Sequence, residues 1–580
     1  MCGIIAIVGN ISDETAKQCS TMLDVQKFRG PDNTGIKVFE SCILGHNRLS
    51  IIDFSSTANQ PMKDSSRDIW ITFNGEIFNF IQLRRTLELV GHTFSTNSDT
   101  EVLLKMYVEY GINFVKRIEG QFAFVIFDRE KNRVIAARDR MGILPLYYSS
   151  WKNKMYFSSM FKAIVKVVPF EIEKESLNEY LFLRYVLPPK TIAKKIFQLS
   201  PGEMMVIENG KKRKFKYWNI EITGKDQKFK IAKSKIKKLI KEAVEKRLVS
   251  DAPVGLFLSG GLDSTIICNV ASKKVPKMNS FSIKFGNHSS EENKFSRAVS
   301  KYYGTVHQII SVEKRQVSSL LDEWIENIDH PNGARDMFAM YMLAKLVKSR
   351  NPEIKVVLTG TGADELFNGY SNAYFAPKDN KQVSSANLKK QITEYFMHYA
   401  FTGENQLEKL KKIAPDFNLD FLHKRVLEIE QTVGISQIDS FNLLNLFYSK
   451  VHLVGWELLV ADNMGMQCSL ELRPPILDTK VVNYAFSIPG EHKYKNGIEK
   501  YILREAFKED LPEEIYLRKK GPFSKQVTDY MSDNFLSSEM NVYRTINKFV
   551  DIEKISELSV HDDADVLWRL YVLSKWIEKN

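Results

Sequence analysis

One segment near the middle of the chain constrains the fold more than any other. The apolar run at residues 254–258 leads into the loop Ser-Gly-Gly-Leu-Asp-Ser at 259–264, and a helical pattern follows at 265–271. Glycines let backbone N–H groups approach an anion closely, and the start of a helix adds the positive end of its dipole. The loop lacks the Gly-Lys-Ser/Thr of a Walker A motif. This order predicts an α/β sheet with an anion-binding edge.

Similar short apolar runs recur further along, between long helical periodicities. Runs at residues 280–285 and 356–358 look like buried strands, and residues 385–460 are mostly helical. This alternation predicts a doubly wound parallel sheet from about residue 232 onward. Ligands bind at the carboxyl ends of such strands, so we expect Asp263 and Asp364 to face one ligand. The alternative for Asp364 is a helix N-cap.

The first 210 residues show a different pattern. Short apolar runs, such as those at residues 4–8 and 122–127, are broken by turn signals, which predicts a strand-rich domain with a few helices. A lysine-rich stretch from residue 211 to 248 predicts a linker followed by an amphipathic helix with a solvated lysine face. We therefore expect a domain over residues 1–210, a linker over 211–231 and a second domain over 232–580.

Composition excludes several classes of protein. The 580 residues are 44% hydrophobic, enough for two or more domains with sizeable cores. The five cysteines form no close pairs, which argues against disulfides or zinc and favours a reducing, cytoplasmic location. The net charge is +12, but no aromatic-interleaved basic motif supports nucleic-acid binding. No apolar run reaches bilayer length and no signal peptide is evident, so we expect no membrane association.

The second residue of the chain, Cys2, is a candidate nucleophile. If Met1 is trimmed, Cys2 carries both a thiol and a free α-amino group. The α-amino pKa is about 7.7–8.0, so this group can act as general base for the thiol beside it. The alternative is an ordinary cysteine that happens to lie early in the chain. The choice depends on the motifs that follow it.

Several further strings stand in one order along the chain: Cys2-Gly3-Ile4, Arg29-Gly30-Pro31-Asp32, Arg48-Leu49-Ser50-Ile51, Asn74-Gly75-Glu76-Ile77-Phe78-Asn79, Ser98-Asp99-Thr100-Glu101, Asp139-Arg140-Met141-Gly142 and the loop at 259–264. With these motifs the chain resembles glutamine-dependent asparagine synthetases over nearly its full length. The resemblance implies an α/β protein of two domains. The first would be an αββα sandwich of the Ntn-hydrolase type with class II glutamine amidotransferase activity. The second would be a doubly wound ATP-pyrophosphatase domain with added helices.

The resemblance implies roles for the N-terminal motifs. Cys2 would attack the glutamine side-chain amide and form a thioester. The Asn74 side chain and the Gly75 N–H would form the oxyanion hole. The remaining residues would bind glutamine: Arg48 its α-carboxylate, Asp99 its α-ammonium, and Glu76 as a positioning group. The alternative for Arg48 and Asp99 is a surface salt bridge.

The resemblance also implies roles in the second domain. Lys520, in the string Arg518-Lys519-Lys520-Gly521-Pro522-Phe523, would stabilise the phosphates during adenylation, with Lys519 as an adjacent competitor. Asp263 and Asp364 would hold Mg²⁺ beside the ATP triphosphate. The segments around Asp462-Asn463 and 469–478 would surround the acceptor pocket. ATP would be bound by a set that combines the loop with three backbone positions, namely Leu258, Ser259, Gly260, Gly261, Asp263, Ser264, Ile283 and Gly360.

The chain departs from the family at the acceptor. Thr361 stands where the family usually has a glutamate near the acyl-adenylate, and Asp462-Asn463 replaces the usual Asp-Arg. We therefore expect asparagine synthesis from aspartate, ATP and glutamine. The alternative is amidation of another carboxylate, such as a uronic acid of a surface polysaccharide or a cell-wall peptide.

A third interpretation is a non-catalytic binding or regulatory protein. It predicts damage at Cys2, Asp263 or Asp364, and all three are intact. An internal ammonia tunnel and a homodimer are also implied, by resemblance alone.

Overall fold

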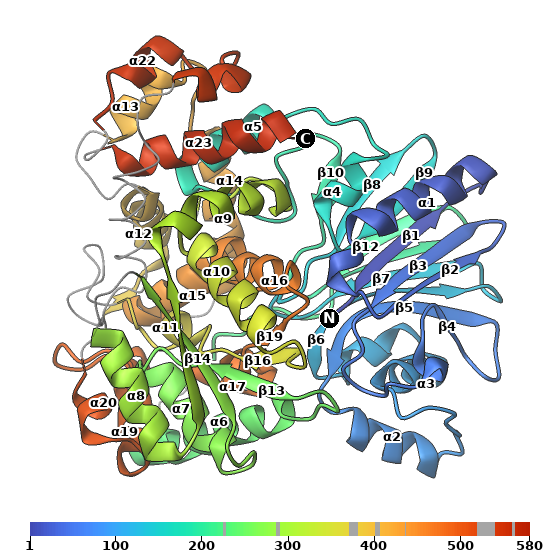
Figure 1. The fold of residues 1–580 in the computed structure, drawn as a ribbon, viewed down its shortest axis with the longest axis horizontal. Helices are drawn as coiled ribbons and strands as arrows, with labels where there is room; N and C mark the ends of the chain where they lie inside the picture. The colour runs from blue at the N-terminus through green and yellow to red at the C-terminus, as the bar shows by residue number, and fades with distance from the viewer. Residues whose placement is uncertain are drawn as a thin grey trace.

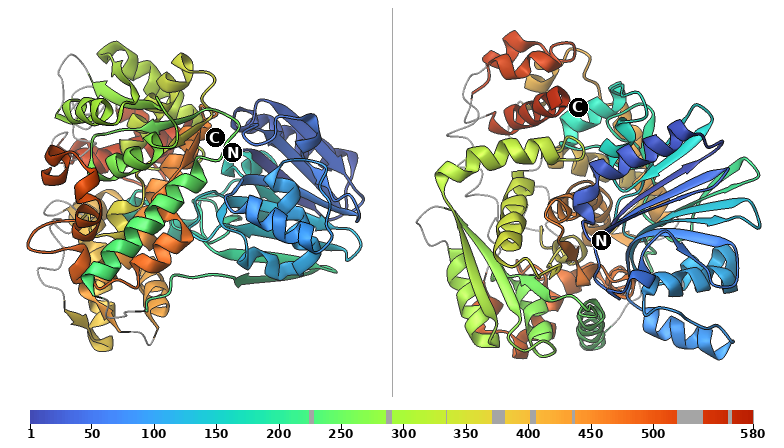
Figure 2. Two further views of the ribbon diagram at one scale, coloured as in Figure 1. Left: turned by 90° about the horizontal axis from the view of Figure 1, so that it is seen from below. Right: turned by 45° about the vertical axis from the view of Figure 1, so that its right-hand side comes forward.

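The computed structural model describes residues 1–223, 228–285, 291–333, 335–370, 381–400, 406–434, 437–518, 540–559 and 563–579. The chain forms two bodies that lie side by side, as Figure 1 and the left view of Figure 2 show. The N-terminus lies at the junction between them (Figure 1). The start of the chain is therefore placed where the two bodies meet.

Two six-stranded antiparallel sheets form the N-terminal body, in the orders β10-β8-β9-β1-β3-β2 and β12-β11-β7-β6-β5-β4. The sheets face each other, and Thr72 Oγ1 of the second sheet donates to Gly45 O of the first across the interface (2.9 Å). Helices α1 and α4 pack on the first sheet and α3 packs on the second, with α2 against α3. The predicted αββα sandwich is confirmed.

The strands of this body are β1 (Gly3–Val8), β2 (Asn33–Val38), β3 (Cys42–Arg48), β4 (Met62–Lys63), β5 (Ile69–Ile77), β6 (Gly120–Asp128), β7 (Arg133–Arg138), β8 (Tyr147–Trp151), β9 (Lys154–Ser158), β10 (Ile196–Gln198), β11 (Glu203–Glu208) and β12 (Lys211–Lys216). Its helices are α1 (Asp13–Val25), α2 (Phe80–Leu89), α3 (Asp99–Tyr110), α4 (Phe161–Val165) and α5 (Lys174–Leu183). Short 3₁₀ turns lie at η1 (Lys27–Arg29), η2 (Ser56–Ala58) and η3 (Gly111–Lys116).

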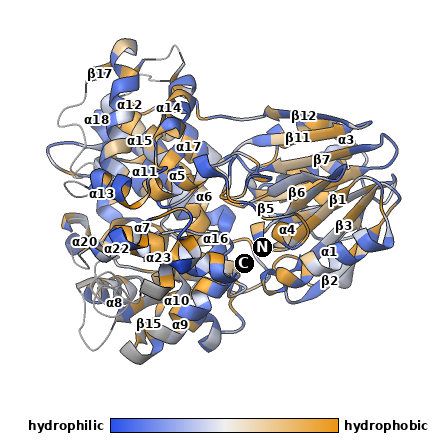
Figure 3. Ribbon diagram, turned by 90° about the horizontal axis from the view of Figure 1, so that it is seen from above, coloured by the Kyte–Doolittle hydropathy of each residue, from blue (hydrophilic) through white to orange (hydrophobic). Residues whose placement is uncertain are grey.

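The first six residues of the expected linker form the strand β12. Residues Lys211–Lys216 pair antiparallel with β11 and are all exposed, so the linker prediction is wrong for these six residues. A lysine-rich strand at a sheet edge is protected from further pairing by its charge, and Figure 3 shows its hydrophilic character. The expected amphipathic helix is present as α6 (Phe229–Arg247), which buries Ile236, Ile240 and Val244.

The second body contains a five-stranded parallel sheet in the order β15-β14-β13-β16-β19. Its strands are β13 (Val254–Phe257), β14 (Asn279–Phe285), β15 (Val306–Val312), β16 (Val356–Leu358) and β19 (Glu471–Arg473). The chain runs outward from β13 to β15 and then returns to β16 on the other side of β13. The switch point of this doubly wound sheet therefore lies between β13 and β16, where a ligand crevice is expected.

Helices surround this sheet: α7 (Leu262–Ser272), α8 (Glu291–Tyr303), α9 (Lys314–Asn327), α10 (Arg335–Arg350) and α11 (Ala363–Leu366). Next come the small ladder of β17 (Gln382–Val383) with β18 (Ile438–Asp439), and the helices α12 (Ser385–Ala400), α13 (Gln406–Ile413), α14 (Asp420–Val433) and α15 (Ser440–Tyr448). The π-helix η4 (Ser449–Glu457) continues directly into α16 (Leu458–Met466). Later elements are η5 (Pro475–Leu477), α17 (Thr479–Ala485), α18 (Gly490–Lys493), α19 (Tyr501–Phe507), η6 (Lys508–Asp510), α20 (Glu513–Leu517), η7 (Met540–Ile546), α22 (Ile552–Ser556) and α23 (Ala564–Lys579).

The last helix, α23, joins the two parts of the chain. Trp568 stacks on Trp324 at 5.9 Å, and Trp576 Nε1 donates to Ile328 O (3.3 Å). Tyr180 on α5 donates from Oη to Arg569 O (2.8 Å), so the two helices lie together, as Figure 1 shows. Both tryptophans are buried and pack α23 against the rest of the protein. None of the helices that the structure describes has the length and hydrophobicity to cross a lipid bilayer.

Candidate active sites

Cys2 lies just before β1 and is buried, with 7% of its surface exposed. Its backbone N–H donates to Asn74 Oδ1 (2.6 Å), and its carbonyl accepts from Arg29 Nε (3.0 Å). The thiol is 3.9 Å from Leu49 O. Burial raises the pKa of the Cys2 thiol, although the N-terminal ammonium opposes this shift. The thiol therefore needs a base beside it to become a nucleophile.

Asn74 and Gly75 lie on β5 next to Cys2. The Asn74 amide accepts from Cys2 through Oδ1, while its buried Nδ2 has no hydrogen-bonding partner among the described residues. Gly75 has φ +143°, and a Cβ there would lie 2.1 Å from Gln121 O, so only glycine fits. A donor without a partner, held beside a thiol, is what an oxyanion hole requires. The structure brings these three residues together.

Arg48 lies at the end of β3, and its guanidinium is engaged by the loop that follows. It donates to Ser55 O (2.9 Å) and Asn59 Oδ1 (2.7 Å), and it also donates to Asp53 O. Asp99 accepts from Ile77 N (2.9 Å), and burial raises its pKa to about 6. Arg48 thus shapes the loop at 52–59, which bounds this side of the Cys2 site.

A buried ion network connects this site to the second body. The N-terminal ammonium of Met1 lies 2.6 Å from Glu471 Oε2, and Arg473 Nε lies 2.6 Å from Glu471 Oε1. Arg473 Nη2 then approaches Glu76 Oε1 at 3.5 Å. Burial, and next the neighbouring Asp99, raise the pKa of Glu76 well above its ordinary value. Glu471 and Arg473 lie on β19, so two side chains of the segment expected around the acceptor pocket face the Cys2 site.

A second buried pair crosses the same junction. Arg29 donates from Nη1 and Nη2 to the two carboxylate oxygens of Asp462, at 2.9 and 2.8 Å. Burial lowers the pKa of the Arg29 guanidinium, but Asp462 outweighs this effect and the pKa is raised. Asp462, expected near the acceptor, is therefore a structural partner of the Cys2 site.

A cavity of about 570 Å³ lies at the carboxyl ends of β13, β14 and β16, at the switch point of the sheet. Lys500 Nζ lies 2.5 Å from Asp263 Oδ2 and 2.9 Å from Asp364 Oδ1. The two carboxylates therefore converge on one point, as the spacing of the motifs predicted. Burial lowers the pKa of Lys500, but the two carboxylates raise it above its ordinary value. Sequence reasoning missed Lys500, whose signal is the string Glu499-Lys500 just before α19.

The loop between β13 and α7 is held by its own side chains. Ser259 Oγ accepts from Gly261 N (3.2 Å) and lies 3.2 Å from Ser264 Oγ. Gly260 has φ +71°, and a Cβ there would lie 2.5 Å from Ser296 N, so glycine is required. The other expected nucleotide positions that line the same cavity are Leu258, Ile283 and Gly360. Lys520 lies outside the described residues; its neighbour Arg518 donates to Gly260 O (2.6 Å).

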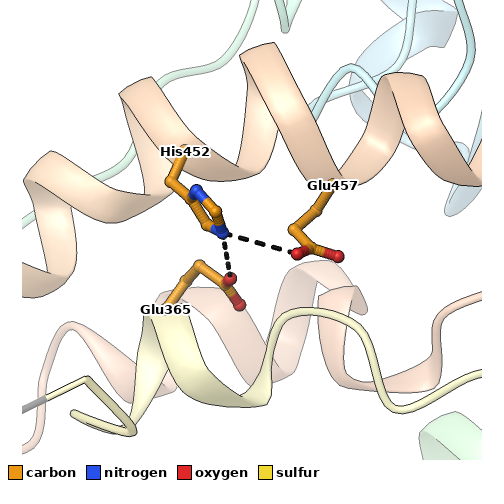
Figure 4. Close-up of side chains that lie close together, drawn as sticks. All are labelled: Glu365, His452 and Glu457. Atoms are coloured by element: carbon orange, nitrogen blue, oxygen red, sulfur yellow. Dashed lines mark ion pairs between the residues drawn. The ribbon is translucent and has the colours of Figure 1, made fainter. Parts of the chain in front are cut away.

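The far end of this cavity carries a cluster that the sequence did not reveal (Figure 4). His452 Nε2 lies 3.4 Å from Glu457 Oε1 and 3.9 Å from Glu365 Oε1. Burial lowers the pKa of His452, but Tyr399, Glu457 and Glu365 together raise it to about 10. Thr361, at the position of the missing family glutamate, lines the same cavity. Acidic groups from other positions of the chain therefore line the cavity that Thr361 also lines.

The fold and the two sites define a class of protein: a cysteine glutaminase of the Ntn type joined to a nucleotide-binding α/β body. Comparison with known families agrees with this class. The family described as "Glutamine amidotransferase domain" matches residues 1–218, and the family described as "Asparagine synthase" matches residues 235–578. The chain therefore belongs to the asparagine synthase family.

Full-length relatives share this organisation. Asparagine synthetase (glutamine-hydrolysing) 1 of Bacillus subtilis is 32% identical over 99% of this chain and 96% of its own length. Asparagine synthetase (glutamine-hydrolysing) 3 of the same organism is 28% identical over 90% of this chain and 87% of its own. The asparagine synthetase (glutamine-hydrolysing) of Zea mays is 28% identical over 94% of this chain and 84% of its own.

Proposed function

We propose that this protein is a glutamine-hydrolysing asparagine synthetase, a carbon–nitrogen ligase. It converts aspartate, ATP and glutamine to asparagine, AMP, pyrophosphate and glutamate. The names of its full-length relatives support this activity. The observation that carries the proposal is the presence of two complete sites in one chain. Cys2 lies beside an unpaired Asn74 donor, and two carboxylates converge on Lys500 in a separate cavity.

In the glutaminase site, removal of Met1, whose ammonium contacts Glu471 in this structure, frees the α-amino group of Cys2 itself. That amine takes the thiol proton, and sulfur attacks the side-chain amide of glutamine. The oxyanion that forms is stabilised by Asn74 Nδ2 and the Gly75 N–H. The leaving ammonia takes a proton from the α-ammonium, and water later cleaves the thioester to give glutamate. We assign glutamine binding to Arg48, Glu76 and Asp99, which lie on the segments around Cys2.

In the second cavity, the Ser259–Ser264 loop and the start of α7 present backbone N–H groups to the ATP phosphates. Asp263 and Asp364 converge within reach of one cation, as their shared contact with Lys500 shows, so this pair fits Mg²⁺. Bound there, Mg²⁺ would neutralise charge on the phosphates. Lys500 holds the carboxylates and adds positive charge, and we assign Lys520 to the same task. The aspartate carboxylate attacks the α-phosphorus and pyrophosphate leaves.

The family matches and the free cysteines support two further assignments. A glutaminase domain over residues 1–210 and a synthetase domain over 232–580 fit the family matches at 1–218 and 235–578. Five free cysteines in the chain fit a reducing cytoplasm. A homodimer, and a dry path that carries ammonia between the sites, are proposed from the family alone. Such a path would keep ammonia unprotonated until it meets the acyl-adenylate.

Mass spectrometry tests the proposed activity. The purified protein is incubated with Mg-ATP, aspartate and glutamine labelled with ¹⁵N at the amide. Labelled asparagine with equal AMP and pyrophosphate supports the proposal and shows that Thr361 is tolerated. Labelled ammonia without asparagine refutes aspartate as acceptor. Uronic acids and peptide carboxylates are then the acceptors to assay.

A further inference from the structure

A second cavity lies at the junction of the two bodies, away from both sites described above. Its volume is about 250 Å³. Residues around Leu187 and Trp218 form its wall on one side, and residues around Arg425 and Lys450 form the other. None of the glutaminase or nucleotide residues assigned above lines it. A cavity of this size fits one small organic molecule.

Two adjacent polar groups line this cavity. Ser449 is only 1% exposed, and its Oγ has no hydrogen-bonding partner among the described residues. A buried hydroxyl without a partner is unfavourable, so its retention needs a reason. Next to it, Lys450 Nζ donates to Asn219 Oδ1 (3.1 Å), which uses one of the three ammonium donors. The cavity thus offers an O–H and N–H groups from consecutive residues.

The charge around these donors favours an anion. Burial, and next the neighbouring Lys216, lower the pKa of Lys450 to about 8. The cavity also contains Arg140 and Arg425, and its acidic lining residue Glu428 is paired with Arg425 (3.1 Å). Both guanidiniums are engaged within the protein, Arg140 by backbone carbonyls and Arg425 by Glu179. The cavity therefore presents the Lys450 ammonium beside the buried Ser449 hydroxyl, with the Lys216 ammonium as a further cationic group in its lining.

The remaining wall is apolar. Trp218, Ile220, Phe396 and the Pro188–Pro189 pair line it. We propose that this junction cavity is a binding site for a small organic carboxylate with an apolar body. The two carboxylate oxygens match the adjacent Ser449 and Lys450 donors, and the body lies against the apolar wall. Inorganic phosphate has more oxygens than these two residues can serve and nothing for the apolar wall to contact.

One helix contributes residues to both this junction cavity and the synthetase cavity. Ser449 and Lys450 begin the π-helix η4, and the same nine-residue helix presents His452 and Glu457 to the cavity near Thr361. π-helical segments are rare and concentrate at functional sites. A ligand at Ser449 therefore binds to the element that shapes the acceptor end.

Competitive chemical labelling tests the site without depending on the identity of the amidated acceptor. The full-length protein is acetylated at pH 8 with a limiting amount of acetic anhydride, and modification of Lys450 is measured by peptide mass spectrometry. Sodium benzoate is the probe, and sodium chloride at equal ionic strength is the control. We expect benzoate to protect Lys450 saturably and to leave the exposed Lys412 on α13 unchanged. Protection equal to that given by chloride would overturn the proposal.

Three further comparisons test the proposed contacts. Ser449→Ala removes one donor with little change in volume and is expected to raise the benzoate concentration for half-protection by about tenfold. Unchanged protection in this variant contradicts the proposed contact. Sodium phosphate is expected to protect no better than chloride, and equal protection by phosphate and benzoate would refute the role of the apolar wall. Calorimetric titration of benzoate into Lys450→Met, with Lys412→Met as matched control, should show binding lost only in the former.

Discussion

The buried Arg29–Asp462 pair offers a sharp test of how the two bodies are held together. Both side chains are at most 2% exposed, and two parallel hydrogen bonds of 2.9 and 2.8 Å join them. Removing one partner of such a pair leaves an uncompensated buried charge and costs about 3–5 kcal/mol. Arg29→Met also loses the Nε bond to Cys2 O, about 1 kcal/mol more. We therefore expect Arg29→Met to be more destabilising than Asp462→Leu.

Replacing both members gives a different expectation. Arg29→Met with Asp462→Leu leaves no buried charge, so the double variant should be less destabilised than either single variant. For all four proteins, the midpoint of urea unfolding is measured by tryptophan fluorescence. Midpoints are compared directly, because a chain with two bodies need not unfold in one step.

Glutaminase activity provides a second readout for the same four proteins. The double variant should recover stability but not activity, because Cys2 still lacks its Arg29 contact. Additive losses of stability in the double variant would refute the electrostatic reasoning and leave packing as the cause.

Four further predictions follow from the two sites. Cys2→Ala should abolish the use of glutamine and leave ammonia-dependent synthesis; loss of both activities would show a structural role as well. Asp263→Asn should stop pyrophosphate release while glutamine hydrolysis persists, and normal pyrophosphate output would contradict the metal assignment. Lys500→Met should lower the rate of pyrophosphate release at least about a hundredfold without changing glutaminase kcat, measured by coupled assays. Gly75→Ala would place a Cβ 2.1 Å from a carbonyl oxygen at a positive φ, so it should cost at least about 2 kcal/mol of stability and displace the backbone N–H from the oxyanion hole. A thermal melt and a glutaminase assay measure these two effects.

Local patterns in the sequence were enough to predict much of this architecture. The run before Ser259 and the run before Gly360 each form a strand, and the strands pair side by side. The convergence of Asp263 and Asp364 follows from that pairing, because parallel strands end at one edge. The linker prediction failed at residues 211–216 because a lysine-rich edge strand has the same composition as a polar linker.

Contacts between distant segments were not predictable in the same way. Lys500 contacts Asp263 across 237 positions, and Arg29 contacts Asp462 across 433. Neither contact produces a periodic pattern or a motif spacing that a single sequence could show. The motif around Asp462 was assigned to the acceptor by resemblance alone, and the pairing of its carboxylate with Arg29 of the Cys2 body could not be foreseen. The His452 cluster was missed because it joins α11 to the π-helix, and no pattern in the sequence predicted a π-helix there.

The strand pair β16–β19 explains how one chain can hold two chemistries in fixed relation. Leu358 lies beside Arg473 in the parallel register, and Thr359 N donates to Arg473 O (3.0 Å) at the edge of the nucleotide cavity. The side chain of the same arginine reaches Glu76 in the glutaminase body. One residue therefore bonds through its backbone to Thr359, which lines the nucleotide cavity, and contacts Glu76 on β5 through its guanidinium. The two sites cannot separate along this connection without breaking either the Arg473–Glu76 contact or this edge of the sheet.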